Sequence, residues 1–568
     1  MKILIVVPRY NDGDYANNIY MFPLGLGYIS AVLKQAGHHV KCLNLNHYSG
    51  KTDHLVQDCL LPDQKFDFVC TGGLSNSYHQ VKAITEAVRS TNTGTGIILG
   101  GGMISSEPEL MFEALKPDYI VIGEGETTIQ ELINCIENNG HVKDIEGIGY
   151  QDNDGQFQIT KKRPPINDLD ALPWPDFKGF GFETYLDNMR PTDFFFYDIF
   201  DFPRVYPIIG SRGCPFLCSF CFHPLGRKYR QRSIDSIMTE LEVMVKKHRI
   251  NIIAIYDELF TYNQERVLEF CERIKKLISE IPWECVWNCQ MRVDGLDEDC
   301  LRIMKEAGCH MVSYGFESYS PIVLKSMQKH IEPEQIKQAV KTTLKSNVSL
   351  QANFIFGDTA ETPQTAKETL DYWKKETDAG IQLGLIAAYP GTKIYQHCID
   401  RGLITNKLDF IANPTEINTA DAMNDKDFEQ LKYDIYCAEL RFRPLTIIDS
   451  LKKTSSEQIH GSIKSIYEVS VTCPHCNKLN LYSNYLIQFG KFFFHTRYCR
   501  SCHRRFYLVS RLYKIVNTFL TIIFIAAGRN LGSKLYFLSI KVKGRIIQLK
   551  PFVKGTIRGI SFRPKIEN

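Results

Sequence analysis

The chain has 568 residues, of which 44% are hydrophobic and 23% are charged. This composition suggests roughly three to four globular domains and excludes intrinsic disorder and collagen-like repeats. The formal net charge is +3, from 67 basic and 64 acidic residues. Residues 504–568 hold 14 Lys and Arg against one acid, Glu567, so this tail carries +13 while the remainder carries −10. The tail is therefore a separate electrostatic element.

The 18 cysteines fall into groups at metal-ligand spacings. At the N-terminus a short apolar run, residues 3–7, is followed by Pro8, which indicates a strand and not a signal peptide. We therefore expect a cytoplasmic protein whose grouped cysteines bind clusters and zinc instead of forming disulfides. The longest uncharged apolar stretch, residues 515–528, has 14 residues, whereas a transmembrane helix needs about 20.

Residues 1–160 alternate short apolar strands with helical patterns. This alternation predicts an α/β fold with a doubly wound parallel sheet. Ligands of such sheets bind beyond the carboxyl ends of the strands, where small residues let the backbone approach. The candidate binding residues at these ends are Thr71, Gly72, Ser75, Gly100, Gly101, Gly102, Gly123 and Glu124. Ordinary loop glycines are the alternative interpretation.

Residues 161–205 contain six prolines and are interpreted as a linker. Residues 206–415 hold six further strand patterns separated by helical ones, which predicts a barrel or partial (β/α)6 barrel with its site at the carboxyl face. Residues 416–470 are expected to be mainly helical. Residues 471–508 form a small cysteine module, and residues 509–568 are the basic, apolar tail.

The segment SRGCPFLCSFC (211–221) directly follows the first of these strands. It contains a Cys-x3-Cys-x2-Cys motif made of Cys214, Cys218 and Cys221. Three thiolates this close together can each bind one iron of a [4Fe–4S] cube and leave the fourth iron open to substrate or cofactor. A structural zinc site with His223 as fourth ligand is the alternative, although such a site needs neither a strand in front nor a barrel behind.

With this loop the sequence closely resembles the radical S-adenosylmethionine (SAM) superfamily. The similarity continues at each later strand end, with YDELF (256–260), MRVD (291–294), GFES (315–318), FIFG (354–357) with ETP (361–363), and YPGT (389–392). The resemblance implies that the three cysteines bind the cluster. It also implies that the open iron chelates SAM, which is then cleaved to a 5′-deoxyadenosyl radical.

The resemblance also implies roles for other residues. Phe220 would lie against the adenine, Asp257 or Glu258 would accept a hydrogen bond from the SAM ammonium, and Arg292 would pair with the SAM carboxylate. Glu317 would hydrogen-bond the ribose hydroxyls, and Gly357 is a further candidate cofactor contact. For any single acid, a solvated loop carboxylate is the alternative.

A doubly wound domain followed by this barrel resembles the cobalamin-binding class of the superfamily, which includes the anaerobic magnesium-protoporphyrin ester cyclase type and several methylases. The matching segments are FPLGLGY (22–28), KQAGH (34–38), GGG (100–102), and Asp118 with GEGE (123–126), and the resemblance covers roughly residues 1–415. The Asp-x-His-x-x-Gly motif is absent, because Leu45 stands at the acid position before His47 and Gly50. The resemblance therefore implies cobalamin bound base-off with a weak or absent lower ligand. A domain that has lost cobalamin remains the alternative.

The chemistry that this class implies is hydrogen abstraction from an unactivated carbon, followed by methylation from methylcobalamin, with the substrate held between cobalt and SAM. The substrate would be a small molecule or lipid, and the reductant a protein such as flavodoxin or ferredoxin. Radical oxidation or ring closure without methyl transfer remains open.

Two Cys-x2-Cys pairs, formed by Cys473, Cys476, Cys499 and Cys502, predict a zinc ribbon. An auxiliary iron–sulfur cluster is the competing hypothesis. The tail mixes Lys and Arg with Ile, Leu and Phe, which favours a peripheral contact with anionic lipid. RNA binding and a helix packed on the barrel with its cations in solvent are the alternatives.

The sequence argues against two other functions. An enzyme that modifies RNA or protein, similar to the methylthiotransferases, would need a second three-cysteine cluster in the first domain. Cys42, Cys59 and Cys70 do not lie at matching strand ends, so we do not expect nucleic acid as the substrate. A non-enzymatic scaffold with a vestigial barrel conflicts with the intact cysteine loop and strand-end motifs.

Overall fold

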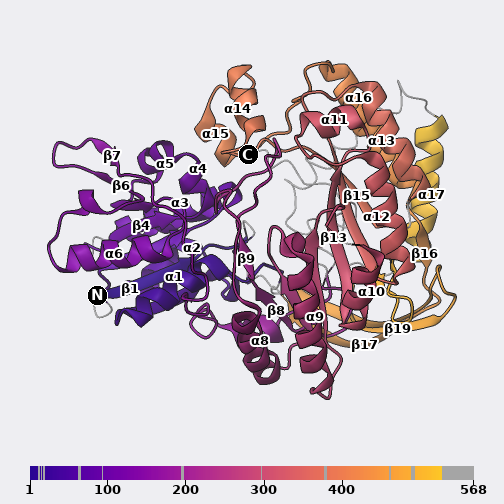
Figure 1. The fold of residues 1–568 in the computed structure, drawn as a ribbon, viewed down its shortest axis with the longest axis horizontal. Coiled ribbons are helices and arrows are strands. Elements are labelled where there is room, and N and C mark those ends of the chain that lie inside the picture. The colour runs from indigo at the N-terminus through magenta and orange to yellow at the C-terminus, as the bar shows by residue number, and fades with distance from the viewer. Residues whose placement is uncertain are drawn as a thin grey trace.

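The computed structural model describes residues 1–10, 13, 14, 16, 19–61, 65–91, 94–192, 197–295, 297–376, 380–459, 462–487 and 493–526. Within them, two parallel sheets lie side by side, and a smaller C-terminal unit packs against the second (Figure 1).

The first sheet contains five parallel strands in the order β2-β1-β3-β4-β5, extended by an antiparallel hairpin, β6-β7. The strands are β1 (Lys2–Val7), β2 (His39–Asn44), β3 (Phe68–Gly72), β4 (Gly96–Gly100), β5 (Tyr119–Val121), β6 (Ile148–Gln151) and β7 (Phe157–Ile159). The helices are α1 (Leu24–Gln35), α2 (Thr52–Cys59), α3 (Tyr78–Ser90), α4 (Gly102–Ser106), α5 (Pro108–Leu115) and α6 (Glu126–Glu137). The strand order changes direction between β1 and β3, the position where doubly wound sheets bind ligands.

Residues 161–205 connect the sheets, and within the described part of this segment, 161–192 and 197–205, several side chains are buried. The segment includes α7 (Phe182–Asp187), and Phe177, Phe180 and Phe182 are buried in the core that both sheets share. Asp176 accepts hydrogen bonds from Ser30 Oγ, at 2.6 Å, and from Lys34 Nζ, both on α1. The interpreted linker is therefore a fixed layer between the two units.

The second sheet has six parallel strands in sequential order, β8-β11-β12-β13-β14-β15, which is the predicted partial barrel. The strands are β8 (Val205–Ile208), β11 (Ile252–Ile255), β12 (Val286–Met291), β13 (Cys309–Glu317), β14 (Ser349–Phe356) and β15 (Ile381–Leu385). The helices are α8 (Ile234–His248), α9 (Gln264–Ser279), α10 (Glu298–Glu306), α11 (Pro321–Ser326), α12 (Pro333–Lys345), α13 (Pro363–Lys375), α14 (Lys393–Asp400) and α15 (Lys407–Ala412).

Capping residues fix where the barrel helices begin. The side chains of Ser233, Asn263, Asp297 and Thr362 each accept a hydrogen bond from a backbone N–H in the first turn of α8, α9, α10 and α13. These polar side chains satisfy donors that have no partner within the helix. Strands β8 and β11 are continuous buried apolar runs, as expected for strands covered on both faces, whereas β12, β13 and β14 also hold the buried polar residues Asn288, His310 and Gln351.

The prediction that residues 416–470 are mainly helical is wrong for the second half of the segment. Helix α16 (Asp425–Phe442) is followed by β16 (Leu445–Ile447) and by the hairpin of β17 (Ser450–Ile459) and β18 (Ser462–Thr472). The hairpin sequence is rich in Ser, Thr, Ile and Val and alternates polar with apolar side chains in β18. The Thr, Ile and Val residues are β-branched and fit a pleated surface better than a helix.

The ribbon strands are β19 (Leu479–Ile487), β20 (Phe494–Tyr498) and β21 (Arg505–Val509), and α17 (Arg511–Ala526) follows them. This unit docks at the amino-terminal ends of the barrel strands. The Tyr498 ring lies 5.6 Å from the ring of His310 at the start of β13, in edge-on geometry. The Arg497 guanidinium donates to the carbonyls of Asp198 and Phe200, each at 3.0 Å, just before β8.

Within the described residues, no helix combines the length and apolar character that crossing a bilayer requires. Helix α17 lies on the side of the barrel that faces away from the first sheet (Figure 1).

Candidate functional site

The cysteine loop lies between two short strands, β9 (Ser211–Arg212) and β10 (Arg230–Gln231), which pair antiparallel. Asp257, at the end of β11, supports the base of this loop. Its carboxylate accepts hydrogen bonds from the Gly210 N–H at 2.6 Å and from Ser211 Oγ at 2.7 Å. Burial raises the pKa of Asp257 to about 6, although these two hydrogen bonds act in the opposite direction.

Within the loop, Cys218 is buried, Cys214 is half-buried and Cys221 is exposed. The loop backbone is fixed by the barrel, since Ser219 donates its N–H to the Met327 carbonyl at 3.0 Å. Burial raises the pKa of Cys214 and of Cys218. Among the described residues, these sulfurs do not form a group as tight as the ribbon cysteines. A cube that binds each thiolate through a different iron has wider spacing than a single ion.

A buried ion pair lies beside Cys218. Lys329 Nζ donates to Glu317 Oε1 at 2.9 Å, and the ammonium lies 5.9 Å from the ring centre of Phe220. Burial alone would lower the pKa of Lys329, but the negative charges of the Glu317 carboxylate and the Cys218 thiolate raise it. Glu317 has a positive φ of 65°, a conformation that only strong local constraints maintain in a residue other than glycine. The sequence motif identified Glu317 but not Lys329.

Arg292 is held by several groups. It donates to both carboxylate oxygens of Asp294, at 3.0 and 3.1 Å, and to the Lys329 carbonyl at 3.0 Å. Its guanidinium lies 3.7 Å from the ring centre of Phe216 in the cysteine loop. Arg292 is therefore pre-positioned at the loop.

Glu258 and His223 face each other across the loop mouth, with Glu258 Oε2 at 3.9 Å from His223 Nδ1. Both carboxylate oxygens of Asp257 accept hydrogen bonds beneath the loop. Of the two neighbouring acids, Asp257 and Glu258, only Glu258 is therefore accessible. Gly357 follows β14 with a φ of 100°, which an L side chain rarely adopts. Its N–H donates to Glu361 Oε2 at 3.4 Å.

The glycines of the first sheet lie against the cysteine loop. A Cβ on Gly102 would lie 2.9 Å from the Phe222 ring, which follows the last loop cysteine. A Cβ on Gly391, at the end of the barrel, would lie 2.6 Å from the same ring. Phe222 therefore bridges the carboxyl ends of the two sheets.

Other predicted residues line the same edge. A Cβ on Gly72 would collide with the Gly100 carbonyl oxygen at 2.1 Å, and a Cβ on Gly101, which has a φ of 91°, would lie 3.0 Å from the Gly73 backbone. Thr71 is buried at the end of β3, and its Oγ1 has no hydrogen-bond partner among the described residues. A buried hydroxyl without a partner is costly, so this edge fits a polar ligand. Ser75 begins the short helical turn that follows, and Gly123 has a φ of 83°.

Glu124 is not at an open edge. It accepts from Arg230 Nη1, at 2.8 Å to each carboxylate oxygen, from Arg212 Nη1 at 3.5 Å and from the Ile166 N–H at 2.6 Å. Arg212 Nη2 also donates to Glu126 at 2.6 Å. Burial would lower the pKa of Arg212, but Glu126 raises it above the ordinary value. These buried pairs join the first sheet to the strands that flank the cysteine loop.

The four ribbon cysteines form a second donor set. Their Sγ atoms all lie within 4.8 Å of one another, with Cys473 and Cys502 at 3.8 Å and Cys476 and Cys499 at 3.5 Å. Tetrahedral zinc with bonds of about 2.3 Å places its sulfurs about 3.8 Å apart. This donor set therefore fits one zinc ion. It lies at the amino-terminal ends of the barrel strands, away from the cysteine loop.

Comparisons with known proteins agree with this geometry. Residues 208–372 match the radical SAM superfamily, and residues 19–133 match the B12 binding domain. An uncharacterized methyltransferase of Pyrococcus horikoshii is 30% identical over 415 residues, which cover 71% of this chain and 84% of that protein. The anaerobic magnesium-protoporphyrin IX monomethyl ester cyclase of Rubrivivax gelatinosus is 27% identical, over 75% of this chain and 74% of its own.

Solved structures with the same fold include the radical SAM methyltransferase TsrM from Kitasatospora setae, with cobalamin and a [4Fe–4S] cluster bound. The TM-score is 0.55 at 18% identity, over 70% of this chain and 76% of that one. The predicted fold class is confirmed, and the residues of the cysteine loop and the glycine edge fit the cofactors of these enzymes. The chain belongs to the family of cobalamin-binding radical SAM enzymes, whose cofactors are a [4Fe–4S] cluster, SAM and cobalamin.

Proposed function

We propose that this enzyme methylates an unactivated carbon of a small molecule or lipid. The observation that carries the proposal is the contact of Phe222 with Gly102 and Gly391. Through this contact, the glycine edge of the B12-binding unit faces the cysteine loop at the carboxyl end of the barrel. An enzyme that takes a hydrogen from a carbon and delivers a methyl group to it needs both cofactors on one substrate pocket.

We assign the cluster to Cys214, Cys218 and Cys221, and SAM to Phe220, Glu258, Arg292, Glu317 and Gly357. Glu258 is the accessible acid for the SAM ammonium, because both oxygens of Asp257 are used under the loop. Arg292 reaches the same mouth with its guanidinium plane fixed on Phe216. Asp257 is a positioning residue for the loop.

We assign cobalamin to Thr71, Gly72, Ser75, Gly100, Gly101, Gly102 and Gly123. When bound, the cluster with SAM supplies a carbon-centred radical, and cobalamin supplies the methyl group. The chain's own residues exclude water and hold the groups together. Phe222 closes the gap between the sheets, and the buried pairs of Glu124 and Glu126 keep the two units in one arrangement. Glu124 therefore acts in positioning the units and not in contact with cobalamin.

Radical ring closure is the second candidate. The relative from Rubrivivax gelatinosus favours it, because that protein is a cyclase and its similarity covers three quarters of this chain. Both candidates need one-electron reduction, for which we propose flavodoxin or ferredoxin, and a reducing, cytoplasmic compartment for the free thiols. We further propose the unit boundaries 1–160 and 206–415 for the B12-binding unit and the barrel. The ribbon expected at 471–508 is part of a larger C-terminal unit that begins at β16, because β16 pairs with β21 and β18 pairs with β19.

Metal and corrin content tests this assignment. We would purify the protein anaerobically, reconstitute it with iron, sulfide and hydroxocobalamin, and read elemental analysis with the absorption spectrum. About four cluster irons, one cobalt and one zinc are expected. Iron and zinc without cobalt would contradict the cobalamin assignment and would make the first unit a substrate or partner module.

A further inference from the structure

Helix α17 carries an apolar stripe on its outer face. Leu512, Ile515, Phe519 and Ile522 are 48%, 65%, 62% and 60% exposed, and their spacing of three and four residues places them on one side of the helix. Large apolar side chains are often exposed singly, but four in a row on one helix mark a surface that something covers.

The opposite face of α17 is already in use. Phe524 packs against Tyr433 and Tyr436 of α16, and the Phe524 carbonyl accepts a hydrogen bond from Tyr433 Oη at 3.0 Å. The helix is thus anchored with the stripe facing away from the barrel.

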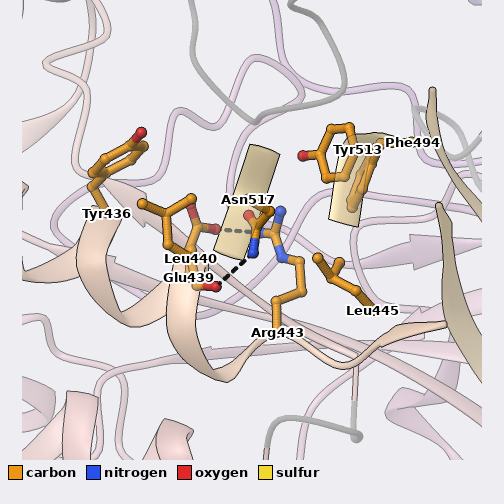
Figure 2. Close-up of a pocket in the computed structure, with 8 residues that line it drawn as sticks. All are labelled: Tyr436, Glu439, Leu440, Arg443, Leu445, Phe494, Tyr513 and Asn517. Carbon is orange, nitrogen blue, oxygen red and sulfur yellow. Dashed lines mark hydrogen bonds and ion pairs between the residues drawn. The ribbon is translucent and has the colours of Figure 1, made fainter. Parts of the chain in front are cut away.

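The start of the helix is also fixed, as Figure 2 shows. Arg443 pairs with Glu439, and its guanidinium lies 5.7 Å from the ring centre of Phe494, beside Tyr513 and Asn517 of α17. Asn517 Nδ2 donates to the Leu440 carbonyl at 3.1 Å. The cavity among these residues is about 20 Å³, which is room for about one water molecule. It is therefore a packing gap between α16 and α17 and not a ligand site.

The stripe lies in the most basic part of the chain. Arg511 and Lys514 belong to the helix itself, and residues 504–568 hold 14 Lys and Arg against one acid. The partner must therefore offer both an apolar phase and negative charge.

Other occupants fail one of these two conditions. A second copy of the helix, or residues 527–568, would bring positive charge against positive charge. RNA offers negative charge and bases that can stack on Phe519, but nothing that would bury the aliphatic side chains of Leu512, Ile515 and Ile522. An anionic bilayer surface offers both, because its headgroups are negative and its acyl chains begin a few ångströms below them.

We propose that α17 lies in the interface of an anionic membrane, with the stripe among the acyl chains and Arg511 and Lys514 at the headgroups. The inference deepens the lipid part of the proposed function and is independent of its radical chemistry. It makes the enzyme a peripheral membrane protein whose barrel is held against the surface by this helix.

Vesicle co-sedimentation of the full, reconstituted chain tests the proposal. We expect binding to vesicles of phosphatidylcholine with phosphatidylglycerol, much weaker binding to phosphatidylcholine alone, and weakening by salt. The double variant Ile515→Asp/Phe519→Asp should lose binding by about tenfold or more. The matched control is Ile322→Asp on α11, where an equally exposed side chain (61%) lies outside the stripe, and it should bind as the parent does.

A second measurement does not depend on the folding of the double variant. Phe519→Trp should add fluorescence that brominated lipid quenches more strongly than it quenches the four native Trp residues. Equal vesicle binding by the double variant and the control would overturn the proposal. The proposal would also be overturned if the parent protein were a dimer that does not bind vesicles and the double variant were a monomer. RNA binding by the parent protein that vesicles fail to displace would overturn it as well. Because the assay uses no substrate, its failure would leave the cobalt measurement and the proposed chemistry untouched.

Discussion

The pair between Arg212 and Glu126 allows a direct test of how the B12-binding unit is held at the cysteine loop. Arg212 stands two residues before Cys214, and the side chains of the pair are 5% and 7% exposed. Glu126→Gln keeps the shape of the side chain and removes its charge. The substitution should loosen the contact between the units while each unit stays folded.

The magnitude follows from the burial of the pair. Removing one partner of a buried pair costs about 3–5 kcal/mol when the other charge is left alone. Arg212 keeps Glu124 at 3.5 Å, so we expect a smaller cost, about 2 kcal/mol. This corresponds to about a 30-fold larger population of states in which the contact is open.

Hydrogen exchange read by mass spectrometry measures this opening. Amides of β9, β10 and residues 161–170 should exchange about 30-fold faster in Glu126→Gln, while β13 and β14 stay unchanged. The control is Glu131→Gln, which removes an exposed charge from the same helix, α6, that pairs with Arg163. A surface pair contributes about 0–1 kcal/mol. Equal exchange rates in the two variants would refute the reasoning.

Three further outcomes are expected. Cys218→Ala should reduce cluster iron from about four per chain to near zero while zinc stays at about one, read by elemental analysis. Cys499→Ser should remove the zinc, leave the iron unchanged and lower the thermal midpoint, because Tyr498 beside it belongs to the barrel core; loss of iron in this variant would argue for an auxiliary cluster. Burial lowers the pKa of His310 to about 3 from 6.5, so the unfolded chain binds more protons between these values, and stability falls as pH falls through this window. The parent protein should lose about 2 kcal/mol of unfolding free energy to this histidine between about pH 6.5 and 5, and His310→Asn should not show that loss in chemical denaturation. Identical pH profiles of unfolding free energy for the parent and the variant would contradict this.

The sequence was sufficient for the parts of the fold that repeat a local pattern. The six barrel strands and the helices capped by Ser233, Asp297 and Thr362 could be predicted, because short segments rich in apolar residues alternate with helical patterns and the caps are polar. The β17–β18 hairpin could not, because its many polar residues show no apolar run long enough to separate it from the preceding helix.

Interactions between segments that are distant in the chain could not be predicted from the sequence either. Lys329 lies in a polar segment after α11, where the sequence predicts exposed side chains. Only the folded path of the chain brings it to Glu317 and Cys218. Glu124 belongs to a glycine-rich strand end like its neighbours, but Arg212 and Arg230 reach it from the barrel. The first case depends on tertiary contacts within the barrel and the second on where two units dock, and local patterns encode neither.

The ribbon's place at the amino-terminal ends of the barrel strands has a consequence for biosynthesis. Arg497 binds the carbonyls of Asp198 and Phe200 next to the first barrel strand, although about 300 residues separate them in the chain. In a nascent chain, every barrel strand therefore leaves the ribosome before the ribbon does. The amino-terminal ends of the barrel strands remain uncovered until then. The ribbon needs zinc to fold, so the zinc supply at the end of translation decides when it covers these strand ends. Zinc starvation should therefore cause newly made enzyme to aggregate, while mature molecules persist.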